Sequence, residues 1–459
     1  MRTDRGRAEH KATHVTLLSG DATKRLRQAL TQRLNSREMT RCFFLGYCVA
    51  MILVYALWVP TMAQPGFPVW GPGDFTAFYT AAHIIREGNA HRLYDLSLQT
   101  QVQQRFLVPH GWTFLDGLLP YNNPPFFAAL FVPLSFLPLA WAFHVWNIAN
   151  IILIIASIKL LLHHQRRRSN GDLIAASLAV FAFFPVLQGL ANGQSSFLLL
   201  FTLVLTYLAL KSKQDYLAGA TLALALIKPQ LVVVIVAIML YRRRWRTLLA
   251  LSVTAVVLLL ASLVIVGVDG VMDYAGLIRQ MLGSDSFHGL HPAPMPNLRG
   301  TVYRFGQLYH TCFGVKPSSV TLKAVTLLLS APVFVLVLRI WKGPWDATSH
   351  RFDLRFSQTV VGTLLLSPHL YSHDLTLLIL VGFLLVNCFA REASNVRAHR
   401  MIAIAHVAAV LPFIFWGGGG QAQIIAFLLV WFMIMMAKET GHWEALGDGM
   451  PASLNANRD

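Results

Sequence analysis

The sequence predicts an all-α integral membrane protein built from many transmembrane helices. Of its 459 residues, 55% are hydrophobic and only 13% are charged, whereas a soluble domain carries about 25% charged residues. The mean hydropathy is +0.53, and apolar runs near the roughly 20-residue length that crosses a bilayer recur along the chain. Because lipid offers no partner to exposed backbone groups, such runs are expected to form helices.

The net charge of +17 is gathered in clusters beside the apolar runs. The clusters include "HHQRRR" (163–168), "KSK" (211–213) and "YRRRWR" (241–246). This distribution is typical of cytoplasmic loops under the positive-inside rule and does not favour nucleic-acid binding. The four cysteines show no metal-binding spacing, and those in apolar runs, such as Cys388, are expected to be small core residues. We therefore expect no metal site and no disulfide.

The N-terminal 1–41 segment is polar and rich in arginine, which predicts a disordered cytoplasmic tail. The apolar run 42–62 lacks a small-residue cleavage site and is expected to be an uncleaved signal anchor. It opens a transmembrane domain predicted to cover 42–438. A cytoplasmic tail at 439–459 completes the chain, so both termini are expected inside.

With the basic clusters inside, the apolar runs predict about twelve crossings and two long external stretches, 63–123 and 268–319. "PPFFAALFVPLSFLP" (124–138) is too short and too broken by proline to span, and is expected to be re-entrant or interfacial. The predicted crossings are 42–62, 139–162, 172–189, 194–211, 215–228, 229–241, 246–267, 320–341, 354–369, 373–390, 401–416 and 421–438.

One carboxylate, Asp74, stands out in the first external stretch, within "GPGDFTAFYTAAHIIREG". Apolar and aromatic residues from Phe75 to Ile85 recur at helical spacing, which predicts an amphipathic helix lying along the membrane surface. Asp74 occupies the N-cap position of that helix. It is therefore either a plain helix cap, as we expect for Asp95, or a residue with a chemical role.

Further motifs follow in order: "YNNPPFFAALFVPLSFLP", "NGQSSFLLL", "LALALIKPQL" and "LLLSPHLYSHDLTLL". Together with the Asp74 stretch they resemble the membrane glycosyltransferases of family 87, from about Asp74 to Leu378. The resemblance implies a GT-C-type helical bundle in the inner (plasma) membrane. It also implies transfer of a hexose, mannose by family likeness, from a polyprenyl-phosphate donor on the external, periplasmic face. The donor is a co-substrate, and no cofactor is expected.

The resemblance implies that Asp74, the acid of the first external loop, carries catalysis. Inverting transfer is a single displacement that needs one carboxylate to accept the proton of the acceptor hydroxyl, unlike the carboxylate pair of a glycosidase. The acceptor is expected to be an external lipid or glycan. We assign His373 to the leaving phosphate or the acceptor, and Asp374 to positioning; a helix cap beside a surface histidine is the alternative.

Three cations are candidates for binding the donor phosphate. Lys228 is the only charge between Asp215 and Arg242 and could pair with phosphate, or simply snorkel to a nearby surface. Arg299 and Arg304 lie in a proline-rich stretch (284–306) that resembles the loop covering the site in GT-C enzymes. They could grip phosphate bidentately or remain solvated.

Polar and aromatic side chains near the external ends of the apolar runs are expected to bind substrate, although such residues are equally common in turns and caps. These candidates are Tyr79, Asn123, Asn192, Gln194, His369 and Asp374. The predicted partners are the polyprenyl-phosphate sugar, its acceptor and membrane lipids, with no nucleic acid. A lipid or solute transporter (a flippase) is the alternative function, and a scaffold without chemistry is a third; transporters usually carry internal repeats, which are not found here.

Overall fold

The computed structural model describes residues 45–53, 73–112, 117–165, 169–284, 287–288, 291–389 and 422–449, which fold into α-helices and short 3-10 helices, labelled η. The predicted N-terminal tail, the predicted crossing 401–416 and most of the crossing 42–62 lie outside the described residues. This part of the chain forms a helical membrane protein, as the composition predicts.

The helices run in the following order: α3 (Phe75–Arg86), η1 (Ala90–Arg92), α4 (Leu96–Leu107), η2 (Val108–His110), α5 (Pro125–Ala129), η3 (Val132–Phe136), α6 (Leu139–His164), α7 (Asn170–Phe181), α8 (Phe184–Ala191), α9 (Ser196–Lys211), α10 (Asp215–Leu224), η4 (Ala225–Ile227), η5 (Pro229–Leu231), α11 (Val233–Tyr241), α12 (Trp245–Gly283), α13 (Leu298–Phe313), α14 (Ser319–Ile340), α15 (His350–Leu366), η6 (Ser372–Leu377), α16 (Leu378–Phe389) and α18 (Ala422–Gly449).

Several of these helices start where a polar side chain accepts a hydrogen bond from the first turn. These caps are Asp95, Ser169, Asn297, Ser318 and Ser349.

Within the described residues, three helices are long and apolar enough to cross a membrane: α6, α12 and α14. The pair α7 and α8 would make a fourth span, although it is bent by 69°. The bend lies where Pro185 opens α8, because proline has no N–H to continue the preceding helix. Shorter apolar helices complete the bundle. The expected twelve crossings are therefore not confirmed.

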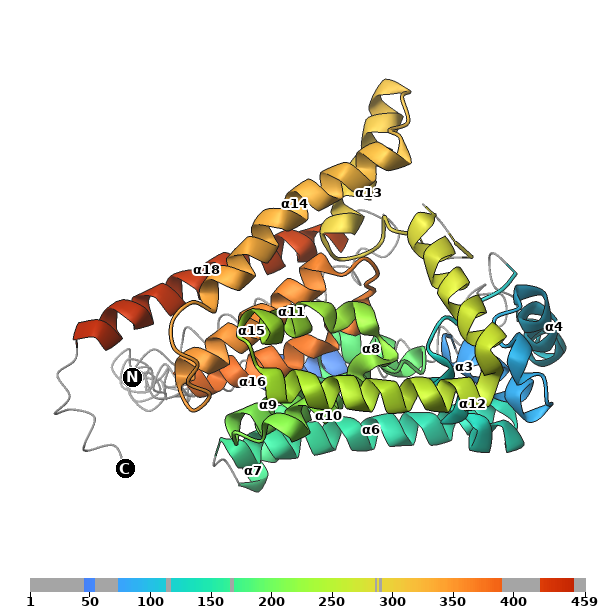
Figure 1. The fold of residues 1–459 in the computed structure, drawn as a ribbon, viewed down its shortest axis with the longest axis horizontal. Helices are drawn as coiled ribbons and strands as arrows, with labels where there is room; N and C mark the ends of the chain where they lie inside the picture. Colours follow the sequence, from blue (N-terminus) through green and yellow to red (C-terminus); the bar gives the residue numbers. More distant parts are fainter. Residues whose placement is uncertain are drawn as a thin grey trace, which may run out of the picture.

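Helix α12 extends far beyond its predicted crossing, 246–267. Gly267 interrupts it with a φ of +73°, a left-handed conformation that glycine adopts without steric cost. The helix then continues to Gly283, and Figure 1 shows the two parts at a sharp angle. The predicted external stretch 268–319 is consequently helical over most of its length, since α13 follows at Leu298.

The helix predicted after Asp74 is confirmed as α3, but it does not lie on a surface. Ten of its twelve residues are buried, and it packs against α4, α5, α6 and η3. Phe78 explains this: its ring lies 5.4 Å from that of Phe127 and 5.0 Å from that of Phe131. Both partners come from the proline-broken segment 124–138, which forms the short helices α5 and η3, so protein rather than lipid covers the apolar face of α3.

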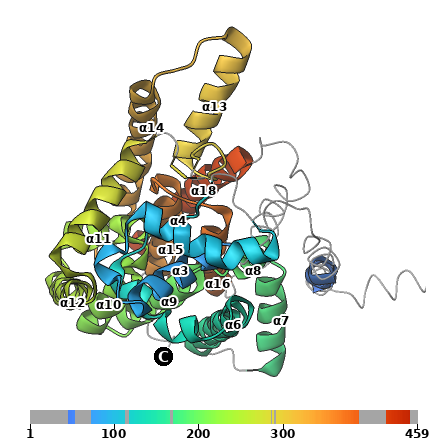
Figure 2. The same ribbon diagram turned by 90° about the vertical axis from the view of Figure 1, so that its right-hand side faces the viewer.

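Helices α3 and α4 lie together at one end of the bundle (Figure 1). Figure 2, turned so that this end faces the reader, shows them in front of the long helices. The turn between α8 and α9 lies at the same end, since the Phe75 N–H at the start of α3 donates to the Asn192 carbonyl, and η6 packs on both α8 and α9. This meeting of segments, all far apart in sequence, positions the polar residues described next.

Candidate active site

Two glycines allow the start of α3 to touch the turn between α8 and α9. Gly73 and Gly193 have φ values of +50° and +58°. A Cβ on Gly73 would lie 2.6 Å from the side-chain oxygen of Asn192, and one on Gly193 would lie 2.6 Å from Phe75. The contact is stabilised by a hydrogen bond of 3.0 Å, which the Phe75 N–H donates to the Asn192 carbonyl. Larger residues at either glycine would separate the two segments.

This contact places the carboxylate of Asp74 against the side chain of Gln194. Although Asp74 stands at the N-cap of α3, its side chain makes no capping hydrogen bond; instead, Oδ2 accepts a hydrogen bond from Gln194 Nε2. Asp95 behaves differently, since its Oδ1 accepts from the N–H groups of Ser97 and Leu98 at 3.0 and 3.1 Å. The structure thus separates the two aspartates: Asp95 is a cap and Asp74 is not.

Gln194 connects Asp74 to a buried lysine. Its Oε1 accepts a hydrogen bond of 3.2 Å from Lys228 Nζ. The same ammonium donates to Ser196 Oγ over 3.0 Å and to Asp374 Oδ1 over 2.6 Å, so its three hydrogens are all used. Lys228 is only 8% exposed and Asp374 1%. The alternative of a lysine that snorkels to the surface is therefore wrong.

Lys228 stands at a break in the helical chain. It separates η4 from η5, with φ −130° and ψ 73°, immediately before Pro229, and a residue that precedes proline is pushed away from helical conformation. The break frees the carbonyl of Ile227, which accepts a hydrogen bond of 3.0 Å from Asn123 Nδ2. Asn123, predicted to bind substrate, thereby holds the backbone that carries Lys228.

Asp374 fulfils two roles that the sequence offered as alternatives. Its Oδ2 accepts from the N–H of Tyr371 over 3.2 Å and caps η6, while Oδ1 pairs with Lys228 and also accepts from Ser196 Oγ over 2.8 Å. The neighbouring His373 is 5% exposed, and its Nε2 lies 3.6 Å from Asp374 Oδ2. His373 and Asp374 are therefore part of one buried polar cluster with Lys228.

The proline-rich stretch before α13 is attached to the loop that precedes η6. Arg299 Nη1 donates to the carbonyl of Pro368 over 2.6 Å, and Asn297 Nδ2 donates to that of Ser367 over 2.8 Å. The Arg299 charge is near enough to act on the His369 imidazole. Arg299 thus reaches the edge of the cluster through its contact with this loop.

Two predicted site residues lie apart from the cluster formed by Asp74, Gln194 and Lys228. Arg304 donates to Gln307, further along α13, over 3.3 Å. Tyr79 is 3% exposed, and its hydroxyl donates to the carbonyl of Leu137 over 2.7 Å. The packing of Tyr79 holds α3 against η3.

Burial and charge set the protonation of the cluster. The surrounding protein raises the pKa of Asp74 to about 6; the positive charge of Lys228 opposes this shift and the negative charge of Asp374 adds to it. Burial lowers the pKa of His369 to about 4, so this imidazole is neutral near pH 7. Asp74 is consequently ionised at neutral pH but more basic than an ordinary carboxylate, as suits a group that accepts a proton.

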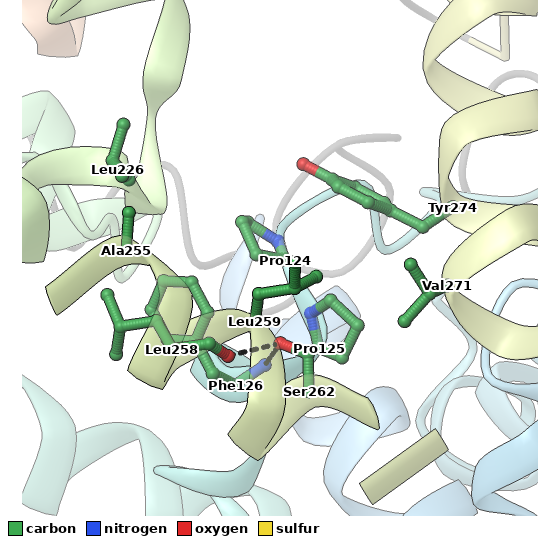
Figure 3. Close-up of a pocket in the computed structure, with 10 residues that line it drawn as sticks. All are labelled: Pro124, Pro125, Phe126, Leu226, Ala255, Leu258, Leu259, Ser262, Val271 and Tyr274. Atoms are coloured by element: carbon green, nitrogen blue, oxygen red, sulfur yellow. Dashed lines mark hydrogen bonds between the residues drawn. The ribbon is translucent and has the colours of Figure 1, made fainter. Parts of the chain in front are cut away.

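An apolar cavity of about 130 Å³ lies beside the break at Lys228. It is lined by the prolines that follow Asn123, by Leu226, and by side chains of α12, with the Tyr274 ring at one side (Figure 3). Pockets for whole drug-sized ligands measure about 300–1,000 Å³. The size and lining therefore suit a piece of hydrocarbon rather than a sugar.

Sequence reasoning missed two members of the cluster. Ser196 bridges Lys228 and Asp374, and Tyr371 supplies the backbone N–H that Asp374 caps. The signal for Ser196 was present, because it follows Gln194 by two residues at the start of an apolar run. Tyr371 gave no such signal, since its contact with Asp374 is made through its backbone N–H.

The comparison with protein families agrees with the motifs. The model of glycosyltransferase family 87 matches residues 121–368, more than half of the chain. No curated protein matches the chain. The matched range contains Gln194 and Lys228, while Asp74 precedes it and Asp374 follows it; the fold brings these two acids to the matched residues.

Removing the lysine charge should destabilise the protein. In Lys228→Met the buried Asp374 loses its counter-ion, and we expect the free energy of unfolding to fall by about 3–5 kcal/mol. The measurement is thermal unfolding of the detergent-solubilised protein. The double variant Lys228→Met/Asp374→Asn removes both charges and should recover most of the loss; equal instability of the single and double variants would contradict the ion-pair interpretation.

Proposed function

The chain belongs to glycosyltransferase family 87, and we propose that it transfers a hexose from a polyprenyl-phosphate donor to an external lipid or glycan acceptor. The observation that carries the proposal is the link from Asp74 through Gln194 to Lys228. It joins a proton acceptor to a fixed cation beside an apolar cavity. For the sugar we propose mannose, from the family resemblance of the motifs.

In the proposed reaction Asp74 is the general base. Gln194 holds Oδ2, which leaves Oδ1 for the acceptor hydroxyl. As the acceptor oxygen attacks the anomeric carbon, its proton passes to Asp74 and the bond from that carbon to the phosphate oxygen breaks. The phosphate leaves with the bonding electron pair, and the anomeric configuration is inverted. One carboxylate is sufficient for this displacement.

The departing phosphate needs positive charge that is fixed in advance. The longest of the three Lys228 hydrogen bonds is the 3.2 Å bond to Gln194; a phosphate oxygen that replaces Gln194 Oε1 would keep the ammonium fully bonded. Arg299 stands at the edge of the same cluster, and His373 borders it through Asp374. Preorganised cations in a site that excludes water stabilise such a leaving group far more than they would in water.

The apolar cavity could bind part of the donor's polyprenyl chain. The apolar cavity is lined by Leu226, two residues before Lys228, and by Pro124, next to Asn123. A polyprenyl chain that enters there would present its phosphate to the lysine. With the basic clusters on the cytoplasmic side, we propose that the Asp74 end faces the periplasm of the inner membrane and that both termini lie inside.

Asp74→Asn should separate catalysis from structure. The amide cannot accept the proton, so we expect transfer from a radiolabelled polyprenyl-phosphate hexose to fall at least about 100-fold, while the elution profile of the detergent-solubilised protein stays unchanged. Asp95→Asn is the matched control, because asparagine caps a helix as well as aspartate does, and it should retain full activity. Full activity in Asp74→Asn would refute the base assignment, and transfer from a nucleotide sugar instead would refute the donor assignment.

The pH dependence should report the raised pKa of Asp74. Because this pKa is about 6 and the ionised form is active, the rate should rise about tenfold from pH 5 to pH 7 and then level off. Gln194→Glu would place a second carboxylate against Asp74, so its acidic limb should move to higher pH. A rate that does not change between pH 5 and pH 7 would contradict the proposed role.

A further inference from the structure

A second buried polar cluster lies at the opposite end of α9. The helix has 16 residues, which places Lys211 about 24 Å from the Ser196 end. Lys211 Nζ lies 2.7 Å from Asp353 Oδ1, and the Tyr207 hydroxyl donates to the same oxygen over 2.8 Å. Asp353 is completely buried. Two donors therefore fix its carboxylate and occupy one oxygen, while the other oxygen faces a different set of groups.

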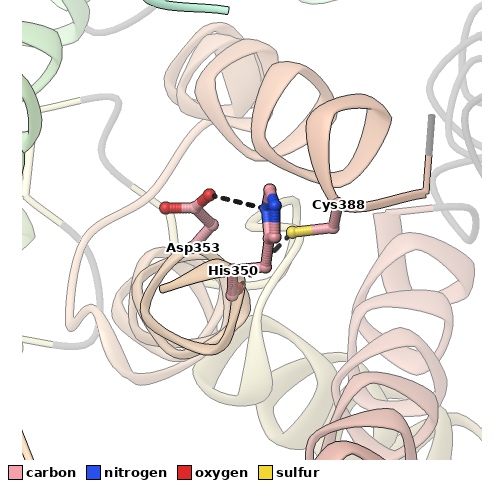
Figure 4. Close-up of side chains that lie close together, drawn as sticks. All are labelled: His350, Asp353 and Cys388. Atoms are coloured by element: carbon pink, nitrogen blue, oxygen red, sulfur yellow. Dashed lines mark hydrogen bonds and ion pairs between the residues drawn. The ribbon is translucent and has the colours of Figure 1, made fainter. Parts of the chain in front are cut away.

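That second oxygen, Oδ2, faces His350 and Cys388. His350 Nδ1 lies 3.7 Å from it, which is too long for a hydrogen bond, and this buried nitrogen has no hydrogen-bond partner among the residues that the structure describes. Asn387 Nδ2 donates a long hydrogen bond of 3.4 Å to Asp353 Oδ2. One ligand atom each of His350, Asp353 and Cys388 lies within 4.8 Å of the other two (Figure 4), and the Cys388 thiol donates to the backbone carbonyl of His350 over 3.5 Å.

We propose that His350, Asp353 and Cys388 bind a zinc ion. Imidazole nitrogen, carboxylate oxygen and thiolate sulfur are the ligands that zinc takes, at about 2.0–2.3 Å, so ligand atoms around a tetrahedral ion lie about 3.3–3.8 Å apart. The His350 to Asp353 distance of 3.7 Å is a few tenths of an ångström longer than the about 3.3–3.5 Å expected between a nitrogen and an oxygen ligand, so a small shift of the two side chains would let both bind. Water supplies the fourth ligand, because the His350 side chain is 30% exposed and gives access to solvent.

The surroundings of the three ligands favour a metal over a simple ion pair. Lys211 and Tyr207 hold Asp353 Oδ1 and so aim Oδ2 at the site, as groups behind a metal ligand commonly do. On binding, the Cys388 thiol releases its proton to solvent, and the thiolate and carboxylate supply two negative charges, which the zinc ion shares with the ammonium of Lys211. No spacing along the chain revealed this site, since Cys388 is far from the other two ligands.

The ion would close a helical hairpin. Helix α15 starts at His350, runs to the loop that carries His369, and α16 returns through η6 to end beside Cys388. The hairpin's turn holds Asp374 in the Asp74 cluster, and zinc would join its two free ends. We therefore assign the metal a structural role: it fixes α15 against α16 at the end of the hairpin remote from the proposed chemistry.

Zinc binding by the full-length protein tests this assignment. The protein, purified in detergent and freed of any histidine tag, is treated with a chelator, dialysed against zinc and analysed for bound metal by mass spectrometry. We expect about one zinc per chain in the wild type, the loss of that ion in Cys388→Ser and in His350→Ala, and no change in Cys312→Ser, which alters an exposed free cysteine.

Two further measurements distinguish loss of the zinc site from misfolding of a variant and from zinc binding at other residues. Added zinc should raise the melting temperature of the wild type and of Cys312→Ser but not of Cys388→Ser. Substituted cobalt should give a thiolate charge-transfer band that Cys388→Ser lacks. A wild type that binds no zinc, or a Cys388→Ser variant that binds as much as the wild type, overturns the proposal; the second outcome would mean adventitious binding at other histidines.

Discussion

The arrangement of the candidate site depends on one buried ion pair, Lys228 with Asp374. Neither charge could remain inside an apolar bundle alone, because the cost of removing an ion from water is several kcal/mol. Their 2.6 Å contact ties the break between η4 and η5 to η6, and both residues share Ser196 at the start of α9. Gln194 then extends the network to Asp74. Each member restricts the others, so the carboxylate of Asp74 has a fixed position.

Polar groups gather where the helices are interrupted. Within a membrane, irregular backbone survives only where protein or water pairs its free groups, and here side chains and neighbouring turns do so. Asn123 bonds to Ile227, and Asn297 bonds to Ser367. The interruptions thus contribute to the site in two ways. They turn the charged side chains inward, and their free carbonyls accept hydrogen bonds that hold the segments carrying those side chains.

The hairpin of α15 and α16 is held at both ends by a lysine–aspartate pair, and α9 contributes one residue at each end. At its turn, Asp374 pairs with Lys228 and meets Ser196 at the start of α9; at its free ends, Asp353 pairs with Lys211 at the end of α9. A helix attached at both ends cannot slide along its partner. The same geometry that fixes Asp374 for the proposed transfer brings the candidate zinc ligands together at the other end.

The sequence by itself determined the helical membrane class, the helix at Phe75, the cap at Asp95, and the candidates Asp74, Lys228 and Asp374, because apolar composition, cap residues and isolated charges are local signals. Only the tertiary structure decided that α3 is buried, that Asp74 bonds to Gln194, and that Lys228 meets Asp374. These partners are 120 and 146 positions apart, and no local pattern encodes a pairing over such separations. The number of crossings is not confirmed for a related reason: short apolar runs predict burial equally in lipid and in protein.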